Sequence, residues 1–421
     1  MSSPLNVYFD ASVLGIAQHD LSARSGVFRV VEALFSRLLN EKEIRLRLTA
    51  TEGLEVKRYV LQYLEGLPPS RAYALPPRSF LAKGYGLLQT ARESVGNRRD
   101  IVTRGANQLL WKAMRSLSRF DVVLPPARET AVFHSNFWPI PSSLQRERNI
   151  RSVLTVHDLW EIMSRSGSEP GPLDRILKSL PSGGWAICVS HKTREDFLNY
   201  RPDIDPQKVV VAHLGVDLRF SPQSSEAVKA ARTRIGVGDY PYFLSTGTFS
   251  ERKNLPIILE AFARGAQANA LDSSRLVLVG AREDQLVRAI DQAPSLKKCR
   301  DRVIATGYLE DGLLPALYSG AVAFLYPSLY EGFGIPILES MACRTPVLGA
   351  DSGSLPEVMG NAGRLLSPRD PDAWSEAMQK ILTDTAEREK LVQEGEARVR
   401  QFSWDRFTES ILGLYRQALS A

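Results

Sequence analysis

Residues 326–342 read YPSLYEGFGIPILESMA, and this stretch predicts a strand, a glycine turn and a helix in succession. The apolar run Ala323–Tyr326 is expected to end a buried strand, and Gly332 and Gly334 stand in the turn that follows. Pro336 is expected at the first helical residue, where its missing N–H costs nothing. Glycine lets a ligand approach the backbone closely, and the amides of a helix start favour an anion. The stretch therefore predicts an anion site of the kind that binds phosphate.

Two glutamates, Glu331 and Glu339, flank this turn at a spacing of eight positions. Glu339 stands among apolar residues, where an unpaired carboxylate is costly, and the two hydroxyls of a ribose are suited to its two oxygens. The alternative is structural: Glu339 as a partly exposed helix residue, and Glu331 as a helix-capping acid. For either residue alone the structural interpretation is favoured. The pair, with the glycine turn between them, favours ligand binding.

A second cluster lies at residues 244–255, which read LSTGTFSERKNL. A strand is expected to end at Gly247, and Arg252 and Lys253 stand just before an apolar helix. Cations at a helix start oppose its dipole, so their placement is locally unfavourable. A diphosphate would resolve the conflict through charge-assisted hydrogen bonds worth roughly 1.5–3 kcal/mol each. Two solvated loop cations are the alternative.

Short aliphatic runs alternate with amphipathic segments of helical length, which predicts α/β architecture with parallel sheets. The expected strands are Asn6–Phe9, Ile44–Ala50, Ala131–His134, Ser152–Val156, Ala186–Val189, Val209–Ala212, Tyr242–Ser245, Leu276–Val279, Val303–Ala305, Ala323–Tyr326, Val347–Leu348 and Arg364–Leu366. Because 421 residues exceed one compact domain, we expect a first domain at 1–220 and a second at 221–403. The apolar stripe of the final helix, within 404–421, is expected to pack back on the first domain.

In the first domain, two histidines follow predicted strands. His157 and Asp158 come after Ser152–Val156, and His134 comes at the end of Ala131–His134. Ligands bind at the carboxyl ends of parallel strands, so these positions are candidates. A lone histidine is more often structural, and we favour His157 because Asp158 is a polar neighbour at the same edge.

Near the amino terminus, Gly26 opens an apolar helix that carries Arg29. This glycine is not part of a G-x-G-x-x-G fingerprint, and the chain has no Walker A motif. Nicotinamide and P-loop functions therefore lose support. Asp203-Ile204-Asp205 has the form of a metal-binding D-x-D, but it falls in a proline-flanked turn, so we interpret it as structural.

The charge of the chain is uneven. Ten Lys and Arg between Arg71 and Arg119 stand against Glu93 and Asp100, a local balance of +8 in a chain of +6. The basicity belongs to one stretch, which argues against nucleic-acid binding. The three cysteines are far apart, and no apolar stretch reaches the roughly 20 residues of a membrane span. We therefore expect a cytoplasmic protein without disulfides or a leader.

These residues together resemble glycosyltransferase family 4, whose members have the GT-B fold of two Rossmann-like domains facing across a cleft. The second half carries the family's E-x7-E motif as Glu331 and Glu339, the Thr345-Pro346-Val347 strand and the Gly353–Glu357 turn. Its donor loop, Gly247–Asn254, resembles the mannosyl- and rhamnosyltransferase branch. Looser matches in the first half are Thr155–Asp158, Val189-Ser190 and His213–Asp217.

The resemblance implies transfer, with retention of configuration, of a hexosyl or deoxyhexosyl group from a nucleoside-diphosphate sugar, with GDP-mannose or a related donor expected. The acceptor would be a glycan or lipid-linked glycan of bacterial surface polysaccharide or lipopolysaccharide, with neither a cofactor nor an essential metal. Glu339 would hold the ribose, Glu331 the sugar, and Arg252 and Lys253 the diphosphate. Thr248 departs from many relatives, which have a basic residue there, and Arg344 replaces a usual glycine.

The implied site divides into three groups. The catalytic residues would be His157, Glu331, Lys253 and Arg252. The donor-binding residues would be Gly247, Thr248, Arg252, Lys253, Tyr330, Gly332, Phe333, Gly334, Ile335 and Glu339. The acceptor-side residues would be Gly26, Arg29, His134 and Asp158.

The motifs leave two other functions open: a nucleotide-sugar epimerase of the same fold, and a non-catalytic GT-B scaffold that binds a glycan. The two glutamates, the two cations and His157 argue against the scaffold. We also expect the basic stretch from Arg71 to Arg119 to meet an anionic membrane or lipid-linked glycan, with an apolar face beside its cations. That face comprises Leu87, Leu88, Val95, Leu109, Leu110, Trp111 and Met114. An ordinary solvated helical insertion is the alternative.

Overall fold

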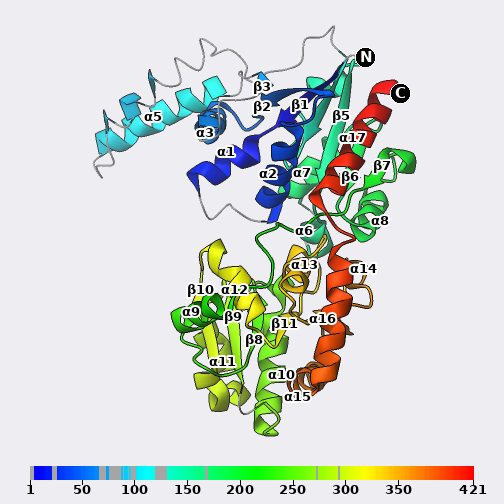
Figure 1. The fold of residues 1–421 in the computed structure, drawn as a ribbon. Coiled ribbons are helices and arrows are strands. Elements are labelled where there is room, and N and C mark those ends of the chain that lie inside the picture. Colours follow the sequence, from blue (N-terminus) through cyan, green and yellow to red (C-terminus); the bar gives the residue numbers. More distant parts are fainter. Residues whose placement is uncertain are drawn as a thin grey trace.

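The structure, a computed structural model, describes residues 4–20, 26–65, 73–74, 87–88, 90–92, 94–95, 101–118, 130–165, 169–271, 274–292 and 294–421. The basic stretch from Arg71 to Arg119 thus lies partly outside the described residues. The seven apolar residues of its predicted face lie within them, and of these Met114 is buried rather than part of an exposed face. Figure 1 shows two lobes, one above the other, each built around a sheet with helices on its faces.

The first lobe contains, within the described ranges, a seven-stranded parallel sheet of order β3-β2-β1-β4-β5-β6-β7. Its central strands are buried on both faces and accordingly read as continuous apolar runs, such as WAIC in β6. The strands are β1 (Leu5–Asp10), β2 (Ile44–Thr49), β3 (Tyr73–Ala74), β4 (Ala131–Ser135), β5 (Ile150–Val156), β6 (Trp185–Cys188) and β7 (Val209–Val211).

Helices cover both faces of this sheet. Close packing of α1 on α3 and of α2 on the C-terminal helix builds much of the cover. The helices are α1 (Ser12–His19), α2 (Gly26–Leu38), α3 (Leu54–Glu65), α5 (Ile101–Ser118), α6 (Trp160–Met163), α7 (Pro172–Lys178) and α8 (His191–Tyr200), with short 3-10 turns η2 (Leu144–Arg146) and η3 (Pro206–Lys208).

The second lobe holds, in the described part of the chain, a six-stranded parallel sheet of order β10-β9-β8-β11-β12-β13. Its strands are β8 (Tyr242–Thr246), β9 (Arg275–Val279), β10 (Val303–Gly307), β11 (Ala323–Tyr326), β12 (Val347–Ala350) and β13 (Arg364–Leu366). Its helices are α9 (Ser225–Ile235), α10 (Leu255–Gln267), α11 (Glu283–Gln292), α12 (Leu314–Ser319), α13 (Ile335–Ala342), α14 (Leu355–Met359), α15 (Pro371–Thr383) and α16 (Thr385–Val399), with 3-10 turns η4 (Glu251–Lys253), η5 (Pro294–Arg302) and η6 (Asp311–Leu313).

Several helices begin at a residue that caps them. The capping side chain accepts a hydrogen bond from a backbone amide of the first turn, which satisfies a donor that the helix itself leaves unpaired. Ser190 caps α8, Ser224 caps α9, Asp370 caps α15 and Asp384 caps α16. These polar residues fix where each helix leaves its loop.

The C-terminal helix α17 (Trp404–Ser420) crosses back to the first lobe, as predicted (Figure 1). It packs on α2, β4, β6 and β7, and an ion pair of 2.7 Å joins Arg37 to Asp405. The predicted boundary near Phe220 falls between β7 and α9, and α9 packs on α12 of the second lobe.

Candidate active site

A cavity of about 460 Å³ lies between the lobes, and both contribute side chains to it. The first lobe supplies Gly26 and Arg29 from α2, and His157 and Asp158 from the loop after β5. The second supplies loops that follow β8 and β11, so the site sits at the carboxyl ends of parallel strands. Its predicted residues in the lining are Gly247, Arg252, Lys253, Glu331, Gly332, Phe333, Gly334, Ile335 and Glu339.

The glycine turn is shaped by two features. Gly334 has φ 103° and stands immediately before α13, a conformation that favours glycine. The hydroxyl of Ser354 donates to the carbonyls of Glu331 and Phe333, each at 2.9 Å. Since α13 begins at Ile335, Pro336 is its second residue rather than the first, one position from our expectation. Because Ser354 belongs to the Gly353–Glu357 motif, this motif holds the glycine turn in place through hydrogen bonds.

Glu331 is buried and joined to a cation. Its Oε1 lies 2.6 Å from Lys253 Nζ, and its Oε2 lies 3.6 Å from Arg252 Nη1. Burial alone would raise the pKa of Glu331, but the two cations hold that pKa below its usual range. Lys253 also donates to the Tyr326 hydroxyl at 2.9 Å. The carboxylate and the cations predicted from separate motifs therefore form one charged cluster.

Arg252 links the lobes. Its Nη1 lies 3.2 Å from Asp158 Oδ2, while its carbonyl accepts from the Leu329 amide at 2.8 Å. The first contact reaches the opposite lobe, and the second ties the η4 loop to the loop after β11. An anion entering the cavity would meet a guanidinium that is already positioned.

Glu339 has a partner that the sequence did not indicate. Its Oε1 accepts from Arg29 Nη1 at 2.6 Å, and its Oε2 accepts from the Tyr318 hydroxyl at 3.3 Å. Glu339 is 3% exposed, so its buried carboxylate requires hydrogen-bonding partners. Arg29, which we expected on the acceptor side, supplies one of them from the first lobe.

His157 faces the glycine turn across the interface. Its Nε2 lies 2.8 Å from the Asn136 carbonyl oxygen, which can only accept, so Nε2 carries the proton. Burial lowers the pKa of His157, more than the Asn136 carbonyl and Asp158 raise it. A Cβ on Gly332 would lie 1.7 Å from the His157 carbonyl oxygen. Only glycine permits the two lobes to approach this closely here.

His134 does not face the cavity, which corrects our expectation of an acceptor-side role. The strand runs on through Ser135, so His134 lies inside the sheet rather than at its edge. Its ring nitrogens lie 2.6 Å from the Tyr415 hydroxyl and 2.7 Å from the Thr155 hydroxyl. The residue is fully buried and holds α17 against the sheet.

Two expected donor residues also lie outside the lining. Thr248 is exposed, and the cavity wall at this loop is formed by Thr246 and Gly247. Tyr330 is buried, and its hydroxyl donates to Asp196 of α8 at 2.8 Å. Tyr330 therefore joins the lobes instead of lining the cavity. The neighbouring Thr193 hydroxyl donates to the Gly332 carbonyl at 3.0 Å.

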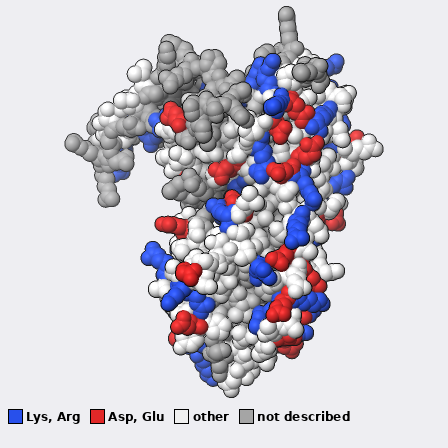
Figure 2. All heavy atoms as spheres, viewed as in Figure 1, with Lys and Arg blue, Asp and Glu red and all other residues white. Residues whose placement is uncertain are grey.

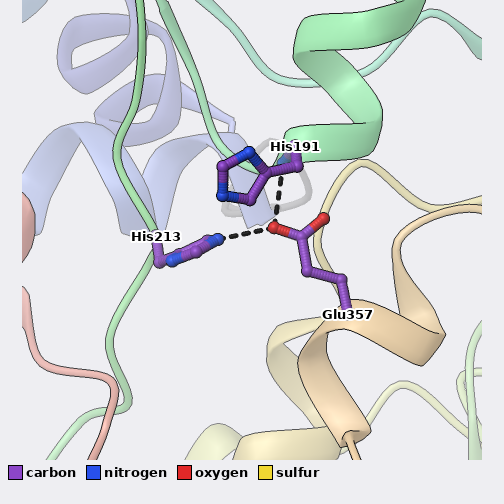
Figure 3. Close-up of side chains that lie close together, drawn as sticks. All are labelled: His191, His213 and Glu357. Atoms are coloured by element: carbon purple, nitrogen blue, oxygen red, sulfur yellow. Dashed lines mark hydrogen bonds and ion pairs between the residues drawn. The ribbon is translucent and has the colours of Figure 1, made fainter.

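Beside the cavity, Glu357 forms a further cross-lobe contact that the sequence did not reveal. Its carboxylate accepts from the amides of His191 and Lys192, at 2.8 and 3.2 Å, and lies 2.5 Å from His213 Nε2 (Figure 3). From the sequence we expect no functional role for either histidine. The sequence offered one signal, the position of Glu357 at the end of the Gly353–Glu357 motif.

The D-x-D triplet is structural in the described fold. Asp203 pairs with Arg201 at 2.7 Å, and Asp205 accepts from the Gln207 amide at 2.9 Å. Both carboxylates thus have protein partners, in a turn next to β7.

Comparisons with known proteins place these features in a wider group. A family model described as glycosyl transferases group 1 matches residues 229–398, and one described as Glycosyltransferase Family 4 matches residues 69–220. The chain is 31% identical over 298 residues to O-antigen chain mannosyltransferase B of Escherichia coli, across 68% of this chain and 74% of that protein. It is 30% identical over 388 residues to a D-inositol 3-phosphate glycosyltransferase of Actinosynnema mirum, across 88% of this chain and 89% of that protein.

Solved structures show the same fold at low identity. A crystal structure of Anabaena HepE in complex with UDP has a TM-score of 0.65 at 15% identity, covering 98% of this chain and 100% of that chain. WaaG, a glycosyltransferase involved in lipopolysaccharide biosynthesis, has a TM-score of 0.60 at 14% identity, covering 97% and 98%. The predicted two-domain GT-B architecture is confirmed.

Proposed function

The chain belongs to glycosyltransferase family 4, and we propose that it transfers a hexosyl or deoxyhexosyl group from a nucleoside-diphosphate sugar bound between its two domains. One observation carries the proposal: a single cavity is lined by Glu331, Glu339, Arg252 and Lys253 of one domain and by His157 of the other. Two carboxylates that suit hydroxyls thus share a cavity with two cations that suit phosphate.

We assign the nucleotide to the second domain. Glu339 would bind the ribose hydroxyls, because its carboxylate is buried in the wall of the cavity and can accept two hydrogen bonds. Arg252 and Lys253 would bind the diphosphate, exchanging part of their contact with Glu331 and Asp158 for the phosphate oxygens. Glu331 would then face the donor sugar.

The chemistry we propose needs no metal at the leaving group. Negative charge grows on the diphosphate as the glycosidic bond breaks, and preorganised cations stabilise that charge in a site that excludes water. Arg252 and Lys253 are such cations. His157 is held neutral by burial and would contact the sugar from the first domain. We propose that the product retains the anomeric configuration of the donor.

The donor that we propose is GDP-mannose or a related sugar nucleotide. The support is the similarity to an O-antigen chain mannosyltransferase and the Ser-Glu-Arg-Lys-Asn form of the donor loop. The acceptor would be a glycan or a lipid-linked glycan, in the synthesis of a bacterial surface polysaccharide or lipopolysaccharide.

Helix α5 is the surface that we propose for a lipid-linked acceptor or an anionic membrane. Leu109 is 70% exposed and Trp111 is 44% exposed, and the sequence of α5 contains Arg104 and Lys112 but no acidic residue. Exposed apolar side chains beside cations are typical of interfacial helices. Over the lobes viewed in Figure 2, by contrast, Lys and Arg are interspersed with Asp and Glu. We therefore propose a cytoplasmic enzyme that acts at the inner face of the membrane.

One structural finding bears on this membrane contact. Among the helices of the described ranges, none has the length and apolar composition to cross a bilayer. Flotation with liposomes of graded anionic content is the direct test. Binding that increases with anionic lipid and decreases with salt supports the proposal, and binding indifferent to both contradicts it.

The experiment that tests the function uses labelled nucleotide sugars, with and without a lipid extract that carries acceptors, in the presence of EDTA. Label that passes from the donor to the lipid or glycan fraction supports the proposal, and His157→Ala should reduce that transfer while leaving nucleotide binding nearly intact. Conversion of the donor without acceptor into an isomeric sugar nucleotide would indicate an epimerase. Nucleotide or glycan binding without any conversion would indicate a scaffold.

A further inference from the structure

Three side chains that could ligate a metal ion meet at the junction of the two domains, outside the cavity. His191 begins α8, His213 follows β7, and Glu357 lies on α14 of the other domain. Their ligand atoms all lie within 4.8 Å of one another, and the three side chains converge in Figure 3. Within the described ranges this is the one such group of His, Cys, Asp and Glu.

Two of the three side chains are held in place by their surroundings. The His213 ring packs against Phe333 and Phe402, with ring centroids 6.0 and 5.6 Å away. The Glu357 carboxylate accepts from the amides of His191 and Lys192. Hydrogen bonds of this type orient a ligating carboxylate. The His191 side chain is exposed, so its ring can rotate toward the other two without disturbing the core.

One pair of the group, His213 and Glu357, differs from tetrahedral ligand spacing by a small movement, and His191 completes the group by rotation of its exposed ring. His213 Nε2 lies 2.5 Å from Glu357 Oε1, as a hydrogen-bonded pair. Two ligands about 2.0–2.1 Å from a tetrahedral ion are roughly 3.3 Å apart, so this pair must open by less than an ångström, roughly, to admit one. For Nε2 to ligate the ion as a neutral imidazole, the ring proton of His213 must be on Nδ1, a tautomer reached by proton exchange with solvent.

The donor set selects the class of ion. Two imidazoles and one carboxylate, with a remaining position for water, suit Zn²⁺ and similar transition metals. Mg²⁺ and Ca²⁺ require oxygen ligands, and here they would find a single carboxylate near the guanidinium of Arg398. Attraction would therefore come from coordinate bonds rather than from net charge.

We propose that His191, His213 and Glu357 bind one Zn²⁺-class ion that joins the two domains. Because the ligands come from both domains, the ion binds only when the domains are together, and it stabilises that arrangement by mass action. The site is distinct from the proposed transfer chemistry, since none of the three residues lines the cavity.

The test measures metal binding directly, with tag-free protein freed of metal by EDTA and then exchanged into buffer without chelator. Zn²⁺ is titrated by calorimetry, and Co²⁺ is used as a probe because its visible absorption reports its ligand geometry. We expect one ion per chain. His191→Ala and His213→Ala should each weaken the affinity by at least about tenfold. His19→Ala, which removes an exposed histidine elsewhere, is the matched control and should bind as the wild type does.

Coupling between the domains is measured by hydrogen exchange at the start of α8. Zn²⁺ should slow exchange of the His191 and Lys192 amides, which Glu357 holds from the other domain, and His191→Ala should abolish the effect. The proposal is overturned if no stoichiometric Zn²⁺ binds, if His191→Ala and His213→Ala bind it like the wild type, or if bound Zn²⁺ leaves these amides unchanged. These readouts do not depend on glycosyl transfer.

Discussion

Arg29 Nη1 lies 2.6 Å from Glu339 Oε1, so an ion pair between residues 310 positions apart connects the first domain to the carboxylate that we assign to the ribose. Glu339 is 3% exposed and the Arg29 side chain 23%, so this contact is largely shielded from water. A ribose that takes the same oxygen must compete with Arg29. On the proposed assignment, Arg29 would therefore set part of the free energy of nucleotide binding, although it lies in the opposite domain.

Arg29→Gln is expected to tighten the binding of the nucleoside diphosphate, because it removes the cation that competes for Glu339. A gain of about tenfold corresponds to about 1.4 kcal/mol. Calorimetric titration measures it, and the same substitution in a Glu339→Gln background should give no gain, since the two residues act on one contact. Weaker binding by Arg29→Gln would instead mean that Arg29 contacts the nucleotide itself.

Lys253→Ala is expected to lower kcat more than it raises the donor KM. The negative charge that Lys253 would stabilise grows in the transition state, and loss of one such electrostatic group typically costs about 10²–10³ in rate. Steady-state kinetics with the identified donor measure the effect, and thermal unfolding in parallel checks the fold. A variant with wild-type kcat would remove Lys253 from the proposed chemistry.

Gly332→Ala is expected to separate nucleotide binding from transfer. The added Cβ would lie 1.7 Å from the His157 carbonyl oxygen, so the domains must move apart. A misplacement on the order of 1 Å can cost about 10²-fold in rate. The nucleotide should still bind, because its proposed contacts are on the second domain.

Gly413→Ala is the matched control for this substitution. Gly413 lies in α17, and its added Cβ would meet nothing within 4 Å in the described structure. The two variants are compared in a transfer assay and in nucleotide titration. Equal turnover by Gly332→Ala and Gly413→Ala would show that this close approach of the domains is not needed.

The sequence predicted most of the fold, because buried parallel strands are short apolar runs that can be recognised from the local sequence alone. The strands expected from Asn6–Phe9 to Arg364–Leu366 are all present within the described ranges, with ends that shift by one or two residues. Strand β3, Tyr73–Ala74, was not predicted, since two residues carry no pattern. His134 was misplaced because β4 runs one residue beyond the predicted end, which puts His134 within the strand rather than at its end.

The site was predicted in part. The residues of the two second-domain motifs lie together, because the strands that precede the two motifs are neighbours in the same sheet. The partners that join the domains were not predictable: Tyr330 meets Asp196 across 134 positions, and His213 meets Glu357 across 144. Such pairs depend on how two separately folded domains pack, and no local pattern encodes that packing.

The stability of the protein is expected to fall in mild acid because of His134. Burial lowers the pKa of His134 to about 3, whereas an unfolded histidine has a pKa of about 6.5. Above about pH 6.5 His134 is neutral in both the folded and the unfolded chain, so the stability that its neutral form contributes is fully present. As pH falls from about 6.5 toward 3, only the unfolded chain gains the proton, so stability falls by about 1.4 kcal/mol per pH unit. His157, whose pKa is also lowered by burial, acts in the same direction.

His134→Gln tests this assignment, because glutamine can hydrogen-bond Tyr415 and Thr155 without titrating. The Tm of each protein is followed from neutral to mildly acidic pH. The variant should lose less stability per pH unit than the wild type. Parallel pH profiles would assign the acid sensitivity to other groups.

The central claim is that the cavity between the domains binds a nucleoside diphosphate through Glu339, Arg252 and Lys253 without a metal. Calorimetric titration with GDP, UDP, dTDP and CDP in EDTA tests it most directly, using the wild type, Glu339→Ala and an Arg252→Ala/Lys253→Ala double variant. We predict one site per chain for at least one nucleotide, binding that is weakened in both variants, and unchanged folding by thermal unfolding. The account is contradicted if none of the four nucleotides binds, if binding requires added metal, or if both variants bind as tightly as the wild type.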